Sequence, residues 1–318
     1  MARKRVLAEP GLDELNAALL AEDFRGSLPL PAHLDRHFEA ALRHVLETPG
    51  SLVRPRMVLQ VATAYGLDGA CANSLAIALE YFHTASLIFD DLPCMDNGLQ
   101  RRGAPCVHVA FGETEAILTA LALINRAYAL TWRALSGCSR DSQSQGMAYL
   151  EQRLGVEGLL NGQSLDLHYS ALPHNRETTE RIAHGKTVSL IRLTLVLPAM
   201  LAGAPAREVQ LLERIAACWG LGYQIVDDLK DMLQTADESG KTVARDVVLD
   251  RPNIAAAIGV PGAIERLNRL MLLGDRTMRR LLMRRPALSF LGKLRSDLQG
   301  ELSRVTEHAC EAPVRARS

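Results

Sequence analysis

The chain has 318 residues, of which 48% are hydrophobic and 23% are charged, a composition typical of a folded globular protein. Its 36 basic and 36 acidic side chains cancel, which excludes a general nucleic-acid binder because such a protein needs a net basic surface. Only 4% of the residues are aromatic while Ala, Leu and Arg are abundant, which favours helices over sheets.

The start of the chain, MARKRVLAEPG, is basic but no apolar region follows it, so we expect no signal peptide. The longest apolar stretch, 190–206, is interrupted by Arg192 and Pro198 and is too short to cross a bilayer. The six cysteines form no CxxC pair and no zinc-like spacing with histidine, so we expect reduced thiols in a cytoplasmic protein.

Apolar periodicity and the Gly and Pro positions predict helices along most of the chain. The expected helices, in chain order, cover 12–24, 32–48, 56–65, 70–92, 113–135, 146–170, 176–202, 205–234 and 252–283, with shorter ones to about 308. The clearest polar loop is SGCSRDSQSQG, residues 136–146. No succession of alternating β-branched runs predicts a sheet, so the expected fold is one all-α domain over residues 1–318.

The segment FHTASLIFDDLPCMDNGLQRRGAP runs from apolar residues into acidic ones. Pro93 stops the helical pattern, and the bend allows Asp96 to return towards the preceding pair of carboxylates. Three carboxylates and two guanidiniums are therefore expected at the end of a helix that looks buried. They belong to Asp90, Asp91, Asp96, Arg101 and Arg102.

A second acidic motif, GYQIVDDLKD, follows another apolar stretch. Asp227 and Asp231 are four residues apart, which places both carboxylates on one face of a helix, and Gln224 shares that face. Two carboxylates about 4 Å apart repel by roughly 4 kcal/mol at an effective dielectric constant of about 20, so they need a counter-charge. Taken alone, the motif also fits a solvated acidic helix end paired with Lys230 or Arg245.

Two carboxylate clusters of this kind suit a hard cation such as Mg²⁺, or Mn²⁺ in its place. Mg²⁺ keeps much of its water and usually bridges protein carboxylates to substrate phosphates. The guanidinium forks of Arg101 and Arg102 match phosphate oxygens. The sequence therefore predicts a site that holds a polyphosphate between two acidic walls with a bridging metal.

Both motifs resemble the aspartate-rich motifs of the trans-prenyl diphosphate synthases, DDLPCMDNGLQRRG the first and DDLKD the second. Further segments resemble that family and follow its order along the chain. They are PGSLVRPR, EYFHTASL, FGETEAIL, NGQSLDL and HGKTVSLI. Within that family, the chain resembles the bacterial geranylgeranyl diphosphate synthases in particular.

The resemblance implies a large helical bundle around a deep central cavity, usually in a homodimer. It implies head-to-tail condensation of isopentenyl diphosphate with an allylic diphosphate, in which the departing diphosphate leaves an allylic cation and later takes up the proton. The resemblance assigns the metal, and with it ionisation of the allylic substrate, to Asp90, Asp91, Asp96, Asp227, Asp228 and Asp231.

The resemblance also assigns roles to other positions. The allylic diphosphate would be contacted by Arg101, Lys186 and Lys241. The isopentenyl diphosphate would be contacted by Arg54, His83 and Arg102, and further substrate contacts would come from the Ser51 and Arg251 positions. Thr187 and Gln224 would face the cation with dipoles rather than full charges.

The chain departs from the family pattern in two places. Ser51 stands where the family has a basic residue, and Arg56 could replace the lost charge only if its side chain folds back. In the segment 240–253, Arg251 keeps the charge but not the shape of lysine, and Asp250 adds a negative charge.

These departures keep two other functions open. A terpene synthase of the same fold ionises a prenyl diphosphate without isopentenyl diphosphate, although the intact Arg54, His83 and Arg102 weigh against it. A non-catalytic subunit that regulates a partner synthase is the other alternative, although the complete aspartate sets weigh against it.

Product length is predicted from the positions just before Asp90. Family members that stop at farnesyl tend to carry a bulky aromatic residue at or beside Ala85, whereas Ala85 and Ser86 are both small here. The expected main product is therefore geranylgeranyl diphosphate, with farnesyl diphosphate second. The residues that limit the chain would then lie deeper in the cavity and would be Tyr81 or Phe82, or residues of a neighbouring helix such as 113–135.

The stretch RTMRRLLMRR, residues 276–285, is basic and amphipathic. A solvated helix face is its ordinary interpretation, and contact with an anionic membrane surface is the alternative.

Overall fold

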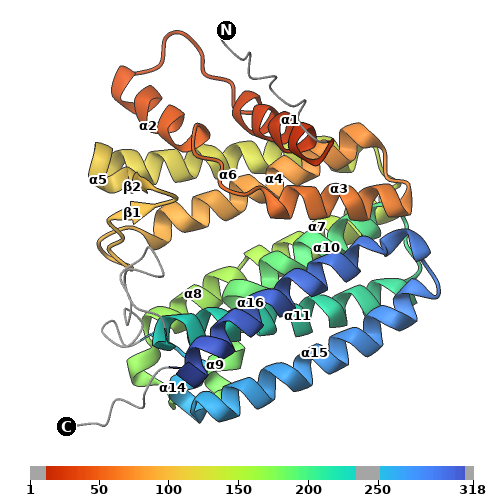
Figure 1. Cartoon of the computed structure of the whole chain (residues 1–318). Coiled ribbons are helices and arrows are strands. Elements are labelled where there is room, and N and C mark those ends of the chain that lie inside the picture. Colours follow the sequence, from red (N-terminus) through yellow and green to blue (C-terminus); the bar gives the residue numbers. More distant parts are fainter. Residues whose placement is uncertain (1–11, 234–250, 312–318) are drawn as a thin grey trace, which may run out of the picture. The chain divides into compact units, whose positions relative to one another are not determined.

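The computed structural model describes residues 12–233 and 251–311, and the side chains of 17–232 and 251–300. Helices follow one another along the chain, as expected of an all-α fold (Figure 1). The contacts divide the chain into an N-terminal unit, Met1–Arg56 with Asn73–Arg133, and a C-terminal unit, Met57–Ala72 with Ala134–Ser318. The all-helical prediction is confirmed, while the assignment of one domain to residues 1–318 stays a prediction.

The N-terminal unit holds most of the residues of the first half of the chain. Its elements are α1 (Leu12–Gly26), α2 (Arg36–Leu46), the start of α3 (Val53–Tyr65), most of α4 (Gly69–Asp90), β1 (Gln100–Arg101), β2 (Ala104–Pro105), α5 (Val107–Phe111) and most of α6 (Glu113–Ser136). The rest of α3, from Met57 on, belongs to the C-terminal unit.

The C-terminal unit holds the remaining helices. They are α7 (Arg140–Leu154), α8 (Leu159–Leu167), the 3₁₀ turn η1 (Tyr169–Ala171), α9 (Arg176–Ala183), the π-helical η2 (His184–Val188), α10 (Ser189–Leu201), α11 (Ala206–Leu233), α14 (Ile254–Ile258), α15 (Val260–Leu282), the 3₁₀ turn η3 (Pro286–Leu288) and α16 (Phe290–Glu311).

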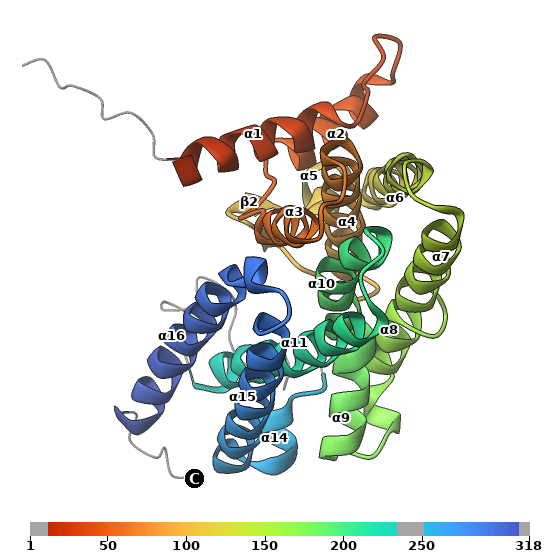
Figure 2. The same ribbon diagram turned by 90° about the vertical axis from the view of Figure 1, so that its right-hand side faces the viewer.

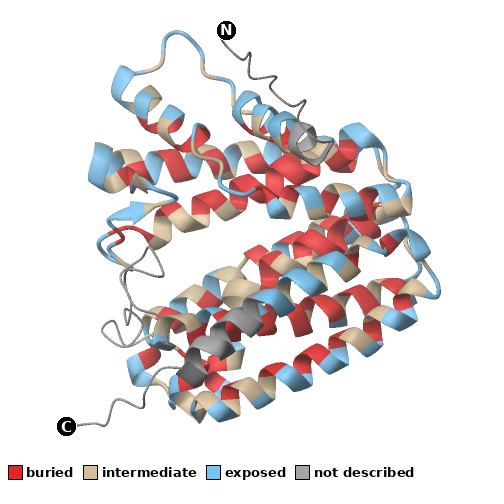
Figure 3. Ribbon diagram, in the orientation of Figure 1, coloured by how far each residue is buried: buried red, intermediate tan, exposed pale blue. Residues whose placement is uncertain are grey.

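Helix α4 carries the first acidic motif at its C-terminal end. It begins after Asp68, whose carboxylate accepts the N–H groups of Ala70 at 2.9 Å and Cys71 at 3.1 Å and so satisfies the helix start. Most of its length is buried, as Figure 3 shows in red. Tyr81 fixes it to α1, because its hydroxyl donates to the carbonyl oxygen of Phe24 and the two rings meet edge to face.

The strands β1 and β2 form the short hairpin that presents the paired arginines. Arg101 is opposite Ala104, and the two turn residues Arg102 and Gly103 have φ values of 56° and 78°. Two consecutive positive φ angles are typical of a type I′ turn, which matches the twist of a two-stranded hairpin. The turn therefore points Arg101 and Arg102 in different directions from adjacent positions.

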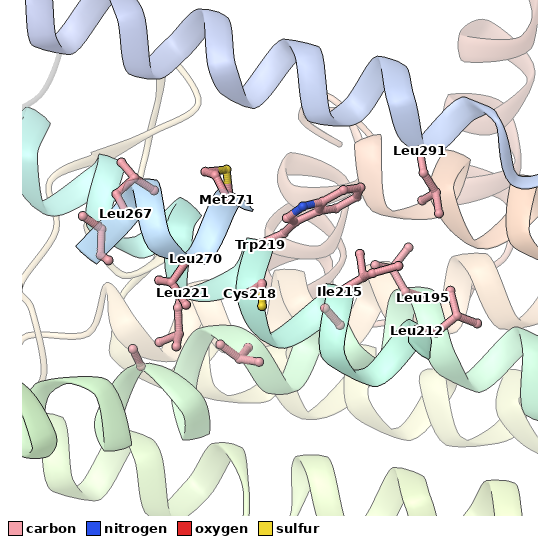
Figure 4. Close-up of a cluster of buried hydrophobic side chains, with 14 of the residues drawn as sticks. Leu195, Leu212, Ile215, Cys218, Trp219, Leu221, Leu267, Leu270, Met271 and Leu291 are labelled. Atoms are coloured by element: carbon pink, nitrogen blue, oxygen red, sulfur yellow. The ribbon is translucent and has the colours of Figure 1, made fainter. Parts of the chain in front are cut away.

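The core of the C-terminal unit surrounds α11, which lies beside α10 and α15 (Figures 1 and 2). Figure 4 shows Trp219 of α11 at the centre of buried residues from α10, α15 and α16. Gly274 makes this contact possible, because a Cβ there would lie 2.8 Å from the indole nitrogen of Trp219. Among the described helices, none is both long and apolar enough to cross a membrane.

The expectation of a polar loop over 136–146 is wrong. Helix α7 begins at Arg140, because the hydroxyl of Ser139 accepts the N–H of Ser142 at 3.2 Å and caps the helix start. Polar composition alone does not separate a loop from a solvated helix with a good cap.

Three further boundaries differ from the expected helices, the first in the expected helix 146–170, which is divided between α7 and α8. Gly259, with a φ of 77°, divides the expected helix 252–283 into α14 and α15. The expected helix 176–202 is present as a run of α9, η2 and α10, and its middle turn is π-helical. A π-helical turn of this kind is rare and often lies at a functional site.

Candidate active site

The first acidic motif folds back on the end of α4. The backbone N–H of Asp96 donates a 2.9 Å hydrogen bond to the carbonyl oxygen of Asp90. The expected return of Asp96 after the bend at Pro93 is therefore confirmed. Both aspartates are half-buried, and their carboxylates are oxygen donors of the kind that Mg²⁺ prefers.

Asp91 points into the protein and pairs with Arg101. The residue is 5% exposed, and Arg101 donates from Nη2 to Oδ1 at 2.6 Å and from Nε to Oδ2 at 2.9 Å. A Cβ on Gly98 would lie 2.5 Å from the same carboxylate, so the loop packs closely on it. The family resemblance assigns Asp91 to the metal and Arg101 to the allylic diphosphate. In this structure Asp91 instead holds the guanidinium of Arg101 in place.

The residues expected to bind isopentenyl diphosphate come together in the N-terminal unit. Nη1 of Arg54 donates to Nε2 of His83 at 2.9 Å, and Nη1 of Arg102 donates to the carbonyl oxygen of Thr48 at 3.1 Å. Gly50, with a φ of 74°, lies so close that a Cβ there would be 2.6 Å from Nε of Arg102. The first turn of α3, helix α4 and the hairpin thus bring two guanidiniums and one imidazole together.

Glu80 also belongs to this cluster, and sequence reasoning missed it. Its Oε1 lies 3.5 Å from Nη2 of Arg102, and the residue is 2% exposed. Burial raises the pKa of Glu80 to about 7, and the charges of Arg54 and Arg102 oppose that rise. The signal was its position three residues before His83, which puts both side chains on one face of α4.

His83 is neutral in this cluster. A guanidinium can only donate, so Nε2 of His83 accepts from Arg54 and the ring proton lies on Nδ1. Burial lowers the pKa of His83 well below its ordinary value, and the positive charges of Arg54, Arg102 and Arg101 lower it further.

Several buried polar atoms of the cluster have no hydrogen-bond partner among the described residues. They include Nε of Arg54, Nδ1 of His83 and Oε2 of Glu80. A buried polar group without a partner costs about 1–3 kcal/mol, so such groups are rarely left together without a ligand. Two of these three atoms carry N–H groups, and an anion would accept from both.

The raised pKa of Glu80 leads to a stability prediction. The pKa of about 7 in the folded protein lies above the ordinary value of 4.5, so the stabilisation from the protonated group is present below pH 4.5 and lost as the pH rises to about 7. The difference, about 7 minus 4.5, corresponds to about 3 kcal/mol. Glu80→Gln should therefore unfold at higher urea concentration than the wild type at about pH 8, with a smaller difference at about pH 5.

Glu39→Gln is the control for this measurement. Glu39 pairs with Arg43 on the surface of α2, and such a pair contributes only about 0.3–0.5 kcal/mol. If Glu80→Gln were destabilising at about pH 8, the carboxylate would be stabilising the folded protein, contrary to this account.

The three carboxylates of the second acidic motif differ in how far they are exposed on α11. Asp227 is exposed and Asp231 is half-buried, one turn apart on the same face. Asp228 is 1% exposed, and its Oδ2 accepts the N–H of Ile254 at 2.7 Å. The carbonyl oxygen of Asp228 accepts from the side-chain amide of Asn253 at 3.1 Å. Asp228 therefore holds the start of α14, while Asp227 faces solvent and Asp231 is only partly exposed, with its Oδ2 buried.

Thr187 and Gln224, which the family resemblance assigns to the cation, are hydrogen-bonded to each other. The hydroxyl of Thr187 donates to Oε1 of Gln224 at 2.6 Å, and Nε2 of Gln224 donates to Oδ1 of Asp228 at 2.8 Å. The buried Asp228 thus fixes which way the amide of Gln224 points.

Lys186 and Arg251 meet at Asp166, a second residue that sequence reasoning missed. Nζ of Lys186 lies 2.9 Å from Oδ2 of Asp166, and Nη1 of Arg251 lies 3.9 Å from the same oxygen. Arg251 also donates to the carbonyl oxygen of Asp166 at 3.3 Å. The signal was the segment NGQSLDL, in which this aspartate is the charged residue.

A glycine contact sets the position of Lys186. Helix α8 crosses η2 where Gly162 meets Gly185, and a Cβ on Gly162 would lie 2.4 Å from the backbone nitrogen of Lys186. A Cβ on Gly185 would lie 2.7 Å from Cα of Gly162. Only glycine at both positions allows this approach of the two backbones.

The expected chain-length positions lie in the buried part of α4. Ala85 is fully buried, and the half-buried Ser86 donates its hydroxyl to the carbonyl oxygen of His83 at 2.8 Å. Phe82, one turn before Ser86, packs its ring against Tyr128 of α6 with the centroids 4.9 Å apart. The small side chains of Ala85 and Ser86 therefore lie about one helical turn from the aromatic pair of Phe82 and Tyr128.

The first departure from the family pattern is partly offset. Ser51 is exposed, and Nη2 of Arg56 donates to its carbonyl oxygen at 3.5 Å. The guanidinium thus folds back towards the position where the family has a basic residue. Lys241, Arg245 and Asp250 lie outside the described residues.

The carboxylates fit a metal that is shared with substrate. Within the part of the chain that the structure describes, no group of three or more His, Cys, Asp or Glu side chains could hold a metal ion. Mg²⁺ commonly uses one or two carboxylates together with water and substrate phosphates. Such pairs of oxygen donors are offered by Asp90 with Asp96 and by Asp227 with Asp231.

The fold is that of the isoprenoid synthases. The structure matches a geranyltransferase from Helicobacter pylori, solved with magnesium and isoprenyl diphosphate, with a TM-score of 0.73 and 26% identity over 96% of this chain and 100% of that chain. A geranyltransferase from Legionella pneumophila gives a TM-score of 0.73 and 26% identity over 90% of this chain and 94% of that chain.

Sequence comparison identifies the family within this fold. The polyprenyl synthetase family model matches residues 35–267, and the chain belongs to this family. A chloroplastic geranylgeranyl pyrophosphate synthase from Capsicum annuum is 36% identical over 226 residues, 71% of this chain and 61% of that protein. The chloroplastic geranylgeranyl pyrophosphate synthase 9 of Arabidopsis thaliana is 34% identical over 262 residues, 81% of this chain and 71% of that protein. The chain thus spans less than two thirds of some of the curated relatives that it matches.

Proposed function

We propose that the chain is a prenyltransferase that condenses isopentenyl diphosphate head-to-tail with an allylic diphosphate, with geranylgeranyl diphosphate as the main product. The observation that carries this proposal is the cluster of Arg54, His83 and Arg102, in which Nε of Arg54 and Nδ1 of His83 are buried without a partner among the described residues. A protein that used only one diphosphate would not need a second basic site.

The isopentenyl diphosphate lies, in this proposal, against the basic cluster. Arg54 and Arg102 supply charge and His83 supplies a neutral N–H donor. Glu80 positions Arg102 through the ion pair that it makes at 3.5 Å. The guanidinium of Arg56, folded back on Ser51, adds charge at the rim.

The allylic diphosphate is bound by the acidic motifs through metal. Mg²⁺ or Mn²⁺, when bound, would neutralise the diphosphate and make it a better leaving group. Asp90, Asp96, Asp227 and Asp231 are the carboxylates proposed to hold the metal. Asp91 and Asp228, which the family resemblance also assigns to it, are proposed to act through their neighbours.

Cationic side chains hold the same diphosphate directly. Arg101 is fixed by Asp91, and Lys186 is fixed by Asp166. Arg251 shares Asp166 with Lys186, which supports a place for Arg251 at the phosphates. Lys241 is proposed for this role on the family resemblance alone.

Loss of the diphosphate leaves an allylic cation, which the double bond of isopentenyl diphosphate attacks to form one carbon–carbon bond. Thr187 and Gln224 present oriented dipoles to that cation, so it is stabilised without being trapped by a nucleophilic charge. A proton is then lost, and the free diphosphate accepts it. The products are a prenyl diphosphate longer by five carbons and one diphosphate.

One assay separates this function from the alternatives. Purified protein is given Mg²⁺ and farnesyl diphosphate, with and without isopentenyl diphosphate. A longer diphosphate that forms only with both substrates is expected. A hydrocarbon or alcohol formed from farnesyl diphosphate alone would indicate a terpene synthase, and no turnover would indicate a non-catalytic subunit.

Ala85→Phe is expected to shift the main product from geranylgeranyl to farnesyl diphosphate. The added ring removes space next to Phe82 that the growing chain needs, and forced overpacking costs about 1–3 kcal/mol. Chromatography of the dephosphorylated products measures this shift. An unchanged product length would show that Ala85 does not limit the growing chain. Ala85→Ser is the control, because it changes the side chain without adding much volume.

A homodimer is proposed on the apolar face of α6. Ile117, Leu121, Tyr128 and Trp132 are 40%, 50%, 48% and 63% exposed and recur at helical spacing. An exposed apolar stripe of this length is typical of an interface between chains. The cytoplasmic location stays a prediction.

A further inference from the structure

One side of α15 combines exposed arginines with exposed apolar residues. These residues recur every three or four positions, so they share one side of the helix. Figure 3 shows exposed positions recurring along α15 in the same way. This surface, the α15 outer face, consists of Leu272, Leu273, Arg276, Arg279 and Arg280 of α15 with Met283 and Arg284 of the turn that follows it.

The arginines of the outer face have no ion pairs with the described residues. The nearest acidic residue in sequence, Asp275, is engaged by Arg295, with Nε 2.7 Å from Oδ1. Arg285 belongs to the same basic stretch but turns inwards, where it stacks over the ring of Tyr65 and pairs with Glu208 at 3.2 Å. The structure thus separates one structural arginine from four that carry uncompensated charge.

Helix stability does not account for these charges. Arg279 and Arg280 lie in the last turn of α15, where positive charge complements the helix dipole. The effect falls off within that turn, so it does not extend to Arg276.

The exposed apolar residues of the outer face distinguish between a nucleic acid and an anionic membrane as the partner. Leu272, Leu273 and Met283 are 58%, 53% and 77% exposed and lie at both ends of the arginine group. A nucleic acid would use the charges but would gain little from two leucines and a methionine. A lipid bilayer with anionic headgroups uses both, because arginines bind lipid phosphates while apolar side chains enter the boundary of the acyl region.

We propose that the α15 outer face binds the surface of anionic membranes. The helix would lie along the bilayer surface with its axis in the interface. This inference does not rest on the proposed function, although membrane contact would suit an enzyme whose product carries a long prenyl chain.

Vesicle co-sedimentation of the whole protein tests the proposal. Vesicles of phosphatidylcholine alone are compared with vesicles that contain about one third phosphatidylglycerol. Binding is expected only to the anionic vesicles and should fall steeply as salt is raised from about 0.05 to 0.5 M, because the Debye length shortens.

A matched pair of variants assigns the binding to this face. The outer-face variant replaces Arg276, Arg279, Arg280 and Arg284 with Gln. The control replaces Arg140, Arg181, Arg207 and Arg214 with Gln, which removes the same charge from exposed arginines elsewhere in the C-terminal unit. Each basic residue near an anionic surface strengthens binding about fivefold, so the outer-face variant should lose a hundredfold or more and the control only a small factor.

A second variant tests whether the apolar residues of the outer face contribute to vesicle binding. Leu272→Ser, Leu273→Ser and Met283→Ser together should weaken vesicle binding at least tenfold without changing the net charge. Equal loss in the control, binding to neutral vesicles, no vesicle binding, or binding only to RNA would overturn the proposal. Circular dichroism melting of each variant shows that the fold is intact, and the readout does not use enzyme activity.

Discussion

Asp227→Ala is expected to lower turnover by several orders of magnitude and to leave the free energy of unfolding within about 0.5 kcal/mol of the wild type. Asp227 is exposed and lies one turn from Asp231, so its removal relieves repulsion between carboxylates and opens no core cavity. In the proposed mechanism the same carboxylate holds the metal, without which the phosphate contact is like-charged. Steady-state kinetics and urea unfolding of the same preparation measure both quantities.

The adjacent Asp228→Ala is the matched comparison, and the opposite pattern is expected for stability. Its removal leaves the N–H of Ile254 and the amide of Gln224 without their acceptor inside the protein. Each such buried group costs about 1–3 kcal/mol, so the free energy of unfolding should fall by about 3 kcal/mol. If Asp227→Ala melted the protein or kept its turnover, the motif would be structural rather than metal-binding.

Gly162→Ala is expected to lower turnover at least a hundredfold and to destabilise the C-terminal unit by about 3 kcal/mol. The new Cβ would lie 2.4 Å from the backbone nitrogen of Lys186 and 2.6 Å from the carbonyl carbon of Gly185. These are backbone atoms, so the clash can be relieved only by moving η2. That movement would pull Lys186 away from Asp166 and displace Thr187 from Gln224.

Gly292→Ala is the control for this prediction, because nothing lies within 4 Å of a Cβ at that position in α16. It should leave turnover unchanged and raise helix stability slightly, since alanine favours a helix over glycine by about 1 kcal/mol. Full activity in Gly162→Ala would show that the close contact of α8 with η2 does not set the position of Lys186.

The fold was predictable because apolar periodicity decides which segments are helical. The loop expected over 136–146 was the exception, since a single cap at Ser139 is enough to start a solvated helix. The π-helical turn at Lys186 was also beyond sequence reasoning, because it depends on how closely Gly162 approaches a helix distant in sequence.

The candidate site was predictable in its residue types but not in their orientation. Each motif contains two adjacent aspartates, which look equivalent in the sequence. Adjacent residues of a helix point about 100° apart, so Asp227 is exposed while Asp228 is buried. Glu80 and Asp166 were missed for a related reason. Each can be recognised only from the basic side chains that lie next to it in the folded protein.

The central claim is that the chain joins two diphosphates with the loss of one. The most direct measurement gives the pure protein farnesyl diphosphate and ¹³C-labelled isopentenyl diphosphate with Mg²⁺, and follows released diphosphate and product mass together. One diphosphate should be released for each labelled five-carbon unit that is incorporated, and excess chelator should abolish both release and incorporation. Diphosphate release without label in the product, or full incorporation without metal, would contradict it.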